Sequence, residues 1–272
     1  MSFAHRHALP DGTVLNYQID GPVDAPWVVF ANSVMTDLHI WKPQLDVLSE
    51  PFRILRYDQR GHGQSTAVST TASFETYGAD LLHLLEALEI KSFHFVGLSM
   101  GVPTGLALLA MAPDRFLSFT AVDGVARSAP GREAFWTEKR EQAQSGGMAA
   151  LARATAERWL PSTPPDSNRH KSLVTIMMAT PVDGFVAATH ALQSYDLSAA
   201  LEWMTCPFLG IAGALDGAMP DAMRTQFSTV AEAGFVEIDG AGHLPNLEQP
   251  AEFNATLMAF LNGQQEHLME AR

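Results

Sequence analysis

Apolar residues along the chain gather in short runs that are separated by stretches with a different spacing. Most runs are continuous rather than alternating, which is typical of strands buried on both faces of a sheet. Seven such runs predict strands, at residues 14–19, 27–31, 53–57, 93–97, 116–122, 207–213 and 234–239.

Between these runs, apolar residues recur at helical spacing. The clearest case runs from Phe74 to Leu88 and follows Ser73, a residue type that caps helix N-termini. Residues 102–111 and 253–261 show the same spacing. Strands and helices that alternate in this way predict an α/β fold with a mostly parallel, doubly wound sheet.

Residues 129–196 interrupt this alternation. They contain no convincing strand, but they include Trp136, Trp159 and the proline-rich stretch "LPSTPPDS". A connection of this length needs structure of its own, so we expect a helical cap over the carboxyl ends of the strands. The core is then made of two parts, residues 1–128 and 197–272. The tryptophans and methionines of the cap favour core packing, with a binding role as the alternative.

Composition narrows the class of protein. The 272 residues are 47% hydrophobic, and 30 acidic residues against 17 basic ones give a net charge of −13, which argues against a nucleic-acid partner. No apolar stretch approaches 18 residues and the N-terminus lacks a signal-peptide run, so we expect a cytoplasmic protein without a membrane partner. The single Cys206 excludes an internal disulfide, and the histidines lack metal-ligand spacing. Composition gives no indication of the oligomeric state.

The stretch "FVGLSMGVPTGLALL" (residues 95–109) joins a predicted strand directly to a predicted helix. Such a joint needs a sharp turn, and Gly97 and Gly101 lack the Cβ atoms that would collide there. Ser99 would then stand exposed at the apex, in the position of a nucleophile.

A serine hydroxyl needs a base to take its proton and an acid to orient that base. Asp216 in "GIAGALDGAMP" and His243 in "IDGAGHLPNLEQP" each follow a predicted strand, at the sheet edge where α/β proteins place their sites. The order Ser, Asp, His is that of α/β-hydrolases. Asp123 in "TAVDGVAR" also ends a strand at this edge and is the alternative acid.

These motifs, with "FANSVMTDLHIW", "RYDQRGHGQS", "AGALD" and "GHLPNLEQPAEF", resemble those of α/β-hydrolases of the 3-oxoadipate enol-lactonase type. The resemblance implies an α/β-hydrolase fold in which Ser99 is the nucleophile, His243 the general base and then acid, and Asp216 the orienting carboxylate. It also implies cleavage of a small lactone or ester through an acyl-enzyme, without a cofactor. Similar proteins cleave amides and C–C bonds, and a cofactor-independent oxygenase or perhydrolase and a non-catalytic ligand-binding protein stay open as alternatives.

The resemblance further implies that the backbone amides of Val34 and Met100 form the oxyanion hole. In "NSVM", Met35 stands where lactonase-like proteins have glycine. We therefore expect Met35 either to crowd the acyl pocket as a substrate contact or to need a different backbone angle. The charged residues of "RYDQRGHGQS", Asp58, Arg60 and His62, are interpreted as a rigid loop beneath the site rather than as catalytic groups.

Charge is distributed unevenly along the chain. Between Arg127 and Lys171, eight basic residues stand against five acidic ones, so the cap is basic while the remainder of the chain is acidic. A positive entrance would attract small carboxylates, and Arg158 beside Trp159 is the predicted substrate-binding pair. The alternative is a solvated helix face with paired charges such as Glu138 and Lys139.

Overall fold

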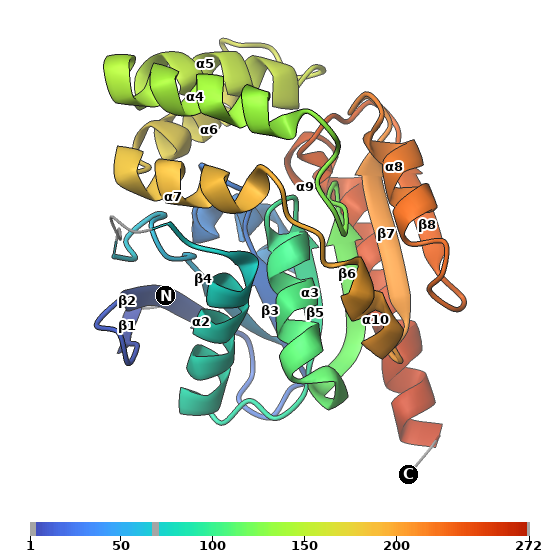
Figure 1. The fold of residues 1–272 in the computed structure, drawn as a ribbon. Coiled ribbons are helices and arrows are strands. Elements are labelled where there is room, and N and C mark those ends of the chain that lie inside the picture. The colour runs from blue at the N-terminus through green and yellow to red at the C-terminus, as the bar shows by residue number, and fades with distance from the viewer. Residues whose placement is uncertain (1–3, 67–70, 271–272) are drawn as a thin grey trace.

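A computed structural model describes residues 4–66 and 71–270 (Figure 1), with side chains up to residue 265. The described residues form a single sheet in the order β1-β2-β4-β3-β5-β6-β7-β8. Its strands are β1 (His5–Ala8), β2 (Val14–Asp20), β3 (Trp27–Ala31), β4 (Arg53–Tyr57), β5 (Phe93–Leu98), β6 (Phe116–Val122), β7 (Phe208–Gly213) and β8 (Gly234–Ile238). Strands β3 to β8 pair in parallel, whereas β2 is antiparallel to both β1 and β4.

All seven predicted strands are present, with ends that differ by at most one residue. Strand β1 was not predicted. Its sequence, HRHA, is polar and largely exposed, and as an edge strand it pairs only with β2. It therefore carries no continuous apolar run from which it could be recognised.

The two faces of the sheet are buried under different helices. Alternate residues of β3 show this division, because Val28 and Phe30 pack in one apolar cluster and Val29 and Ala31 in the other. The first cluster is shared with α1 (Lys42–Leu48) and α10 (Pro250–Glu270), and the second with α2 (Phe74–Ala87) and α3 (Gly101–Met111). In Figure 1, α2 and α3 lie on the opposite face from α10. The doubly wound α/β fold is thus confirmed.

The predicted start of α2 is also confirmed. The hydroxyl of Ser73 accepts a hydrogen bond from the Thr76 N–H, and the Thr76 hydroxyl accepts one from the Ser73 N–H. This capping box satisfies two amides at the helix N-terminus. The core is completed by α8 (Met219–Gln226), α9 (Pro245–Glu248) and the 3-10 helices η1 (Leu38–Trp41), η2 (Pro113–Arg115) and η3 (Ser198–Trp203).

Four α-helices lie between β6 and β7 and gather beyond the carboxyl ends of the strands (Figure 1). They are α4 (Arg132–Gly146), α5 (Met148–Trp159), α6 (Asn168–Met178) and α7 (Val182–Leu192). The two ends of this segment meet in an antiparallel bridge between Arg127 and Asp196. The predicted helical insertion is therefore present, whereas its division from the core at residues 129 and 196 as a separate domain stays a prediction. We keep the name cap for residues 129–196.

The cap touches the core through a contact between two glycines. A Cβ on Gly184 of α7 would lie 2.0 Å from the Gly61 carbonyl oxygen, and one on Gly61 would lie 2.7 Å from the Gly184 Cα. Only residues without a side chain allow this approach. Gly61, with a φ of +75°, also needs the left-handed region that glycine tolerates.

Among the described residues, no single helix is long and apolar enough to cross a membrane. The helices α6 and α7 meet the length and composition criteria only when taken together, and they are bent by 93° at the break between them.

Candidate active site

The joint between β5 and α3 has the geometry that its sequence predicts. Ser99 has a φ of +51°, and its N–H donates to the Val122 carbonyl at 2.7 Å. A Cβ on Gly97 would lie 2.6 Å from the Gly101 carbonyl oxygen, and one on Gly101 would lie 2.4 Å from the Ala31 carbonyl oxygen. Side chains at these two positions would therefore prevent the turn that presents Ser99.

Ser99, His243 and Asp216 form a hydrogen-bonded chain across three loops of the core. The Nε2 atom of His243 lies 2.9 Å from the Ser99 Oγ, and its Nδ1 atom lies 2.7 Å from Asp216 Oδ2. A carboxylate accepts only, so Nδ1 carries the proton and Nε2 is left to accept the proton of the serine hydroxyl. This arrangement can draw a proton from Ser99 and return it to a leaving group.

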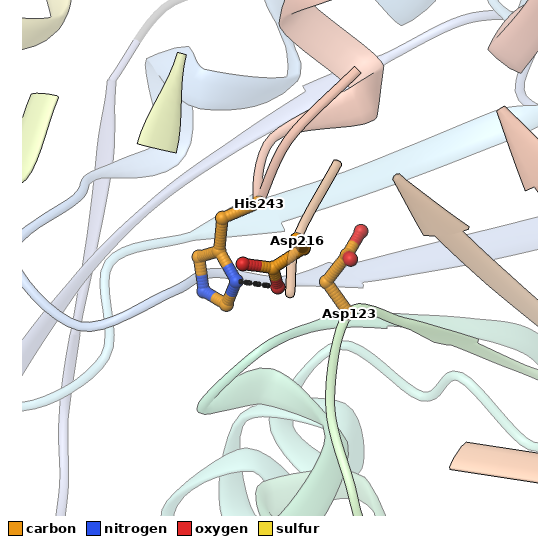
Figure 2. A group of neighbouring side chains, drawn as sticks. All are labelled: Asp123, Asp216 and His243. Carbon is orange, nitrogen blue, oxygen red and sulfur yellow. Dashed lines mark hydrogen bonds and ion pairs between the residues drawn. The ribbon is translucent and has the colours of Figure 1, made fainter. Parts of the chain in front are cut away.

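Asp123 reaches the same place from the end of β6. In Figure 2 Asp216 lies between His243 and Asp123, and one donor or acceptor atom of each residue lies within 4.8 Å of the other two. The imidazole hydrogen-bonds to Asp216, however, and the structure records no such bond between His243 and Asp123 within the range it describes. The structure thus places Asp216, rather than the alternative Asp123, in hydrogen-bond contact with the His243 imidazole.

Asp123 has an unusual electrostatic environment. Its side chain is fully buried, and burial is the main cause that raises the pKa of its carboxyl well above the usual range. The negative charge of Asp216 raises the pKa further, against the opposing effect of the Gly213 N–H. Because the ligand atoms of Asp123, Asp216 and His243 are used in hydrogen bonds with one another or with Gly213, we assign no metal site to them.

The two predicted oxyanion donors come from different segments of the core. Val34 follows β3 and lines the cavity above Ser99, and Met100 is the N-cap residue of α3. Within residues 4–66 and 71–270, neither N–H donates a hydrogen bond to another protein group. Both are therefore available to an anionic oxygen, and the positive end of the α3 dipole lies behind Met100.

The structure corrects the prediction for Met35. Its φ is +62°, so the methionine adopts the backbone angle expected of a glycine, and its side chain is buried in the apolar core. Met35 is not among the described residues that line the cavity. At this glycine-like backbone angle the side chain lies in the core and away from the cavity lining.

The loop that follows β4 is held by its own charged side chains. Asp58 accepts hydrogen bonds from the N–H groups of Leu38 and Gln64 at 2.7 and 2.9 Å, and Arg60 is paired with Asp80. His62 is fully buried, which lowers its pKa to about 4 and leaves the imidazole neutral. These contacts support the interpretation of a rigid loop.

A cavity of about 420 Å³ opens above Ser99 between the core and the cap. Trp159 forms one wall and packs on the His243 imidazole, with ring centroids 4.6 Å apart. Arg158, predicted with it, also lines the cavity, as does Trp136, for which a binding role was the alternative to core packing. Arg132 and Tyr195 line it too, and the sequence did not predict either of them as a site residue. The apolar spacing of the cap helices does not indicate which of their polar side chains face inward.

The arginines of the cavity lack anionic partners. In the part of the chain that the structure describes, neither the Arg132 guanidinium nor the Arg158 guanidinium forms an ion pair or a hydrogen bond. The Arg132 guanidinium lies over Phe135 and Trp136, at 4.3 and 5.1 Å from their ring centroids. Burial and the charge of Arg158 lower the pKa of Arg132. The Trp136 Nε1–H is buried and finds no hydrogen-bond acceptor among the residues that the structure describes.

Comparison with known proteins agrees with this architecture. Residues 26–250 match the family described as alpha/beta hydrolase fold. The chain is 34% identical to 3-oxoadipate enol-lactonase 1 of Acinetobacter baylyi over 92% of its own length and 94% of that protein. The crystal structure of the enol-lactonase from Burkholderia xenovorans LB400 superposes with a TM-score of 0.87 at 34% identity, covering 95% of this chain and all of that one. A hydrolase from Pseudomonas aeruginosa PA01 gives the same TM-score at 32% identity, covering 95% and 98% of the two chains. This chain therefore belongs to the α/β-hydrolase family.

Proposed function

We propose that this protein hydrolyses a small lactone or ester that carries a free carboxylate, through an acyl-enzyme on Ser99. The observation that carries the proposal is that one cavity holds both the Ser99, His243 and Asp216 chain and two arginines that have no ion-pair partner among the described residues. The hydrogen-bonded chain supplies the chemistry of acyl transfer, and the two arginines select an anionic substrate.

The acylation step follows from the hydrogen bonds. Ser99 Oγ attacks the substrate carbonyl while His243 Nε2 takes its proton, and Asp216 stabilises the resulting imidazolium. The new oxyanion accepts from the Val34 and Met100 N–H groups. When the tetrahedral intermediate collapses, the bond to the ring oxygen breaks and Nε2 returns the proton to that oxygen.

Deacylation reverses these roles with water as the nucleophile. His243 Nε2 takes a proton from water, the hydroxide forms a bond to the acyl carbon, and the bond to Ser99 Oγ breaks. The serine oxygen recovers its proton from Nε2, and a carboxylic acid leaves as its anion. Atoms balance with water alone, so no cofactor is needed.

The two arginines provide a site for the carboxylate of the substrate. An unpaired guanidinium binds a carboxylate through two parallel hydrogen bonds, and the buried Trp136 Nε1–H supplies a further donor. The similarity to 3-oxoadipate enol-lactonases supports a negatively charged substrate. An enol-lactone of a dicarboxylic acid such as 3-oxoadipate keeps one free carboxylate after the other closes the ring. A cavity of about 420 Å³ suits a molecule of this size.

A pair of substrates tests the charge preference. We expect a carboxylated lactone to show a higher kcat/KM than its methyl ester, and added salt to narrow the difference by screening. Arg132→Gln and Arg158→Gln should each raise KM for the carboxylated lactone about 10-fold or more and leave the methyl ester unaffected. The matched control is Arg153→Gln, because Arg153 is an exposed arginine of α5 outside the described cavity lining. Equal kcat/KM for both substrates at low salt would contradict the carboxylate site and leave a general esterase.

The covalent step needs its own experiment. Rapid quenching followed by mass spectrometry should detect an acyl group on Ser99 when an activated ester is turned over. A reaction without this adduct, retained by Ser99→Ala, would favour the oxygenase alternative. A protein that turns over no activated ester or lactone would favour the ligand-binding alternative.

A further inference from the structure

Asp123 is a buried carboxyl for which the acyl-transfer mechanism has no use. It follows β6 with a φ of +41°, and its side chain has no exposed surface. Its backbone N–H donates to the Ile211 carbonyl at 3.0 Å, which fixes the residue against β7. The left-handed backbone is costly for a residue other than glycine, so the side chain is held in this place by its surroundings.

The contacts of the Asp123 side chain reach the turn that carries Asp216. Both carboxyl oxygens lie within reach of the Gly213 N–H, at 3.0 and 3.3 Å. The Gly213 carbonyl in turn accepts from the Asp216 N–H at 3.0 Å, which closes the turn after β7. Asp123 thus lies against both the start of this turn and the carboxyl of Asp216 (Figure 2).

The charges around Asp123 cannot balance two ionised carboxyls. The charged or titratable groups that face this place are Asp216 itself, His243 beyond it, and Arg132 from the cap, whose charge interacts with Asp216. No ion pair of Asp123 is found in the described residues. A fully buried carboxylate with one neutral donor is expensive, and two adjacent carboxylates repel each other. Asp216, in contrast, is partly exposed and hydrogen-bonded to His243.

We propose that Asp123 is a protonated carboxylic acid that donates a hydrogen bond to the Asp216 carboxylate and so acts as a positioning residue. One Asp123 oxygen accepts from the Gly213 N–H, and the hydroxyl of the other donates to Asp216. Asp216 is then held from one side by Asp123 and from the other by His243 Nδ1. The proposal rests on the proposed function only for its catalytic consequence, because the protonation itself is a property of the folded chain.

Protonation gives the proposal a pH dependence with a definite sign. The pKa of Asp123 is raised in the folded state, whereas an unfolded aspartate has a pKa of about 3.9. Between these two values the folded chain binds one more proton than the unfolded chain, so this residue contributes less stability as the pH rises. Asparagine carries an amide in place of the proton and has no such dependence.

The experiment compares Asp123→Asn with Asp123→Ala. Asparagine keeps an oxygen for the Gly213 N–H and an N–H for Asp216, whereas alanine keeps neither. We expect kcat for the asparagine variant to stay within about threefold of wild type and kcat for the alanine variant to fall about 10- to 100-fold, with KM little changed in both. The melting temperature of Asp123→Asn relative to wild type should rise by at least about 3 °C between pH 5 and pH 8. Asp24→Asn, at an exposed loop aspartate, should show no such rise.

A readout without turnover separates this proposal from the proposed function. At pH 7 the infrared difference spectrum of wild type minus Asp123→Asn should contain the C=O band of a carboxylic acid, and the same difference for Asp24→Asn should lack it. Absence of this band would overturn the proposal even in an active enzyme. An asparagine variant as impaired as the alanine variant, or an alanine variant as active as wild type, would also overturn it. A protein inactive on all esters and lactones but with the band present would contradict the proposed function alone.

Discussion

Glu248 links the loop of His243 to the cap, and its removal should impair both stability and turnover. It ends α9, five residues after His243, and its side chain is 4% exposed. One carboxylate oxygen accepts from the Gly242 N–H at 2.7 Å, next to the catalytic candidate His243. The other accepts from the Ser162 N–H at 2.9 Å and the Thr163 hydroxyl at 2.8 Å. The Glu248 side chain therefore fixes the position of His243 relative to the cap segment that follows Trp159.

The loss of stability in Glu248→Ala depends on whether water can replace the carboxylate at each of the three donors. Ser162 is exposed, so water can replace the carboxylate at its N–H. Gly242 and Thr163 are buried, and an unsatisfied buried donor costs about 1–3 kcal/mol. We expect the free energy of unfolding to fall by about 2–6 kcal/mol in total, the sum for these two donors. A small displacement of His243 should also lower kcat about 10- to 100-fold.

Urea unfolding and steady-state kinetics measure the two effects. Glu248→Gln keeps the shape but not the charge, and a single amide oxygen serves only one side of the link, so its losses should lie between those of wild type and Glu248→Ala. Glu50→Ala is the control because Glu50 is exposed, and its unfolding free energy should change by less than about 0.5 kcal/mol. An unfolding free energy for Glu248→Ala equal to that of Glu50→Ala would refute the reasoning.

Three further predictions concern the reaction and the contact between cap and core. Ser99→Ala should lower kcat by a factor on the order of 10⁵ to 10⁶ with an unchanged urea midpoint, and more than a tenth of wild-type activity would exclude the covalent mechanism. Asp216→Asn should lower kcat about 10⁴-fold in steady-state assays because the imidazole takes the wrong tautomer, and a larger loss in Asp123→Asn would reverse their roles. Gly184→Ala should lower the free energy of unfolding by about 1–3 kcal/mol, since its Cβ would meet the Gly61 carbonyl. Gly146→Ala in α4, where a Cβ meets nothing within 4 Å, is its control in urea unfolding and should not be destabilised.

The core of the fold was predictable because its strands are buried on both faces. Continuous apolar runs predict such strands, and the two glycines beside Ser99 predict the sharp turn, because that turn requires residues without a side chain. The order of Ser99, Asp216 and His243 was also predictable, since each follows a strand and the carboxyl ends of parallel strands meet at one edge. Strand β1 was not, because its exposed residues carry no apolar pattern.

The residues of the cavity were harder to predict for a physical reason. Cap helices are amphipathic, and their spacing indicates which side faces the core but not which residues at its margin reach the site. Arg132 and Arg158 lie on different helices and meet only through the packing of α4 against α5. Met35 is the opposite case, a predicted substrate contact that does not reach the cavity. Its positive φ places the side chain in the core.

Core and cap contribute different parts of the site, and this division bears on how substrate selection can change. Ser99, Asp216 and His243 come from loops of the sheet, where a rigid scaffold keeps their hydrogen bonds short. Arg132 and Trp136 come from α4, and Arg158 and Trp159 from α5. Trp159 contacts both parts, because it lines the cavity and packs on the His243 ring. We therefore expect substitutions of the arginines to alter the charge of the accepted substrate without touching the proposed acyl-transfer groups, whereas a substitution of Trp159 should change both KM and kcat.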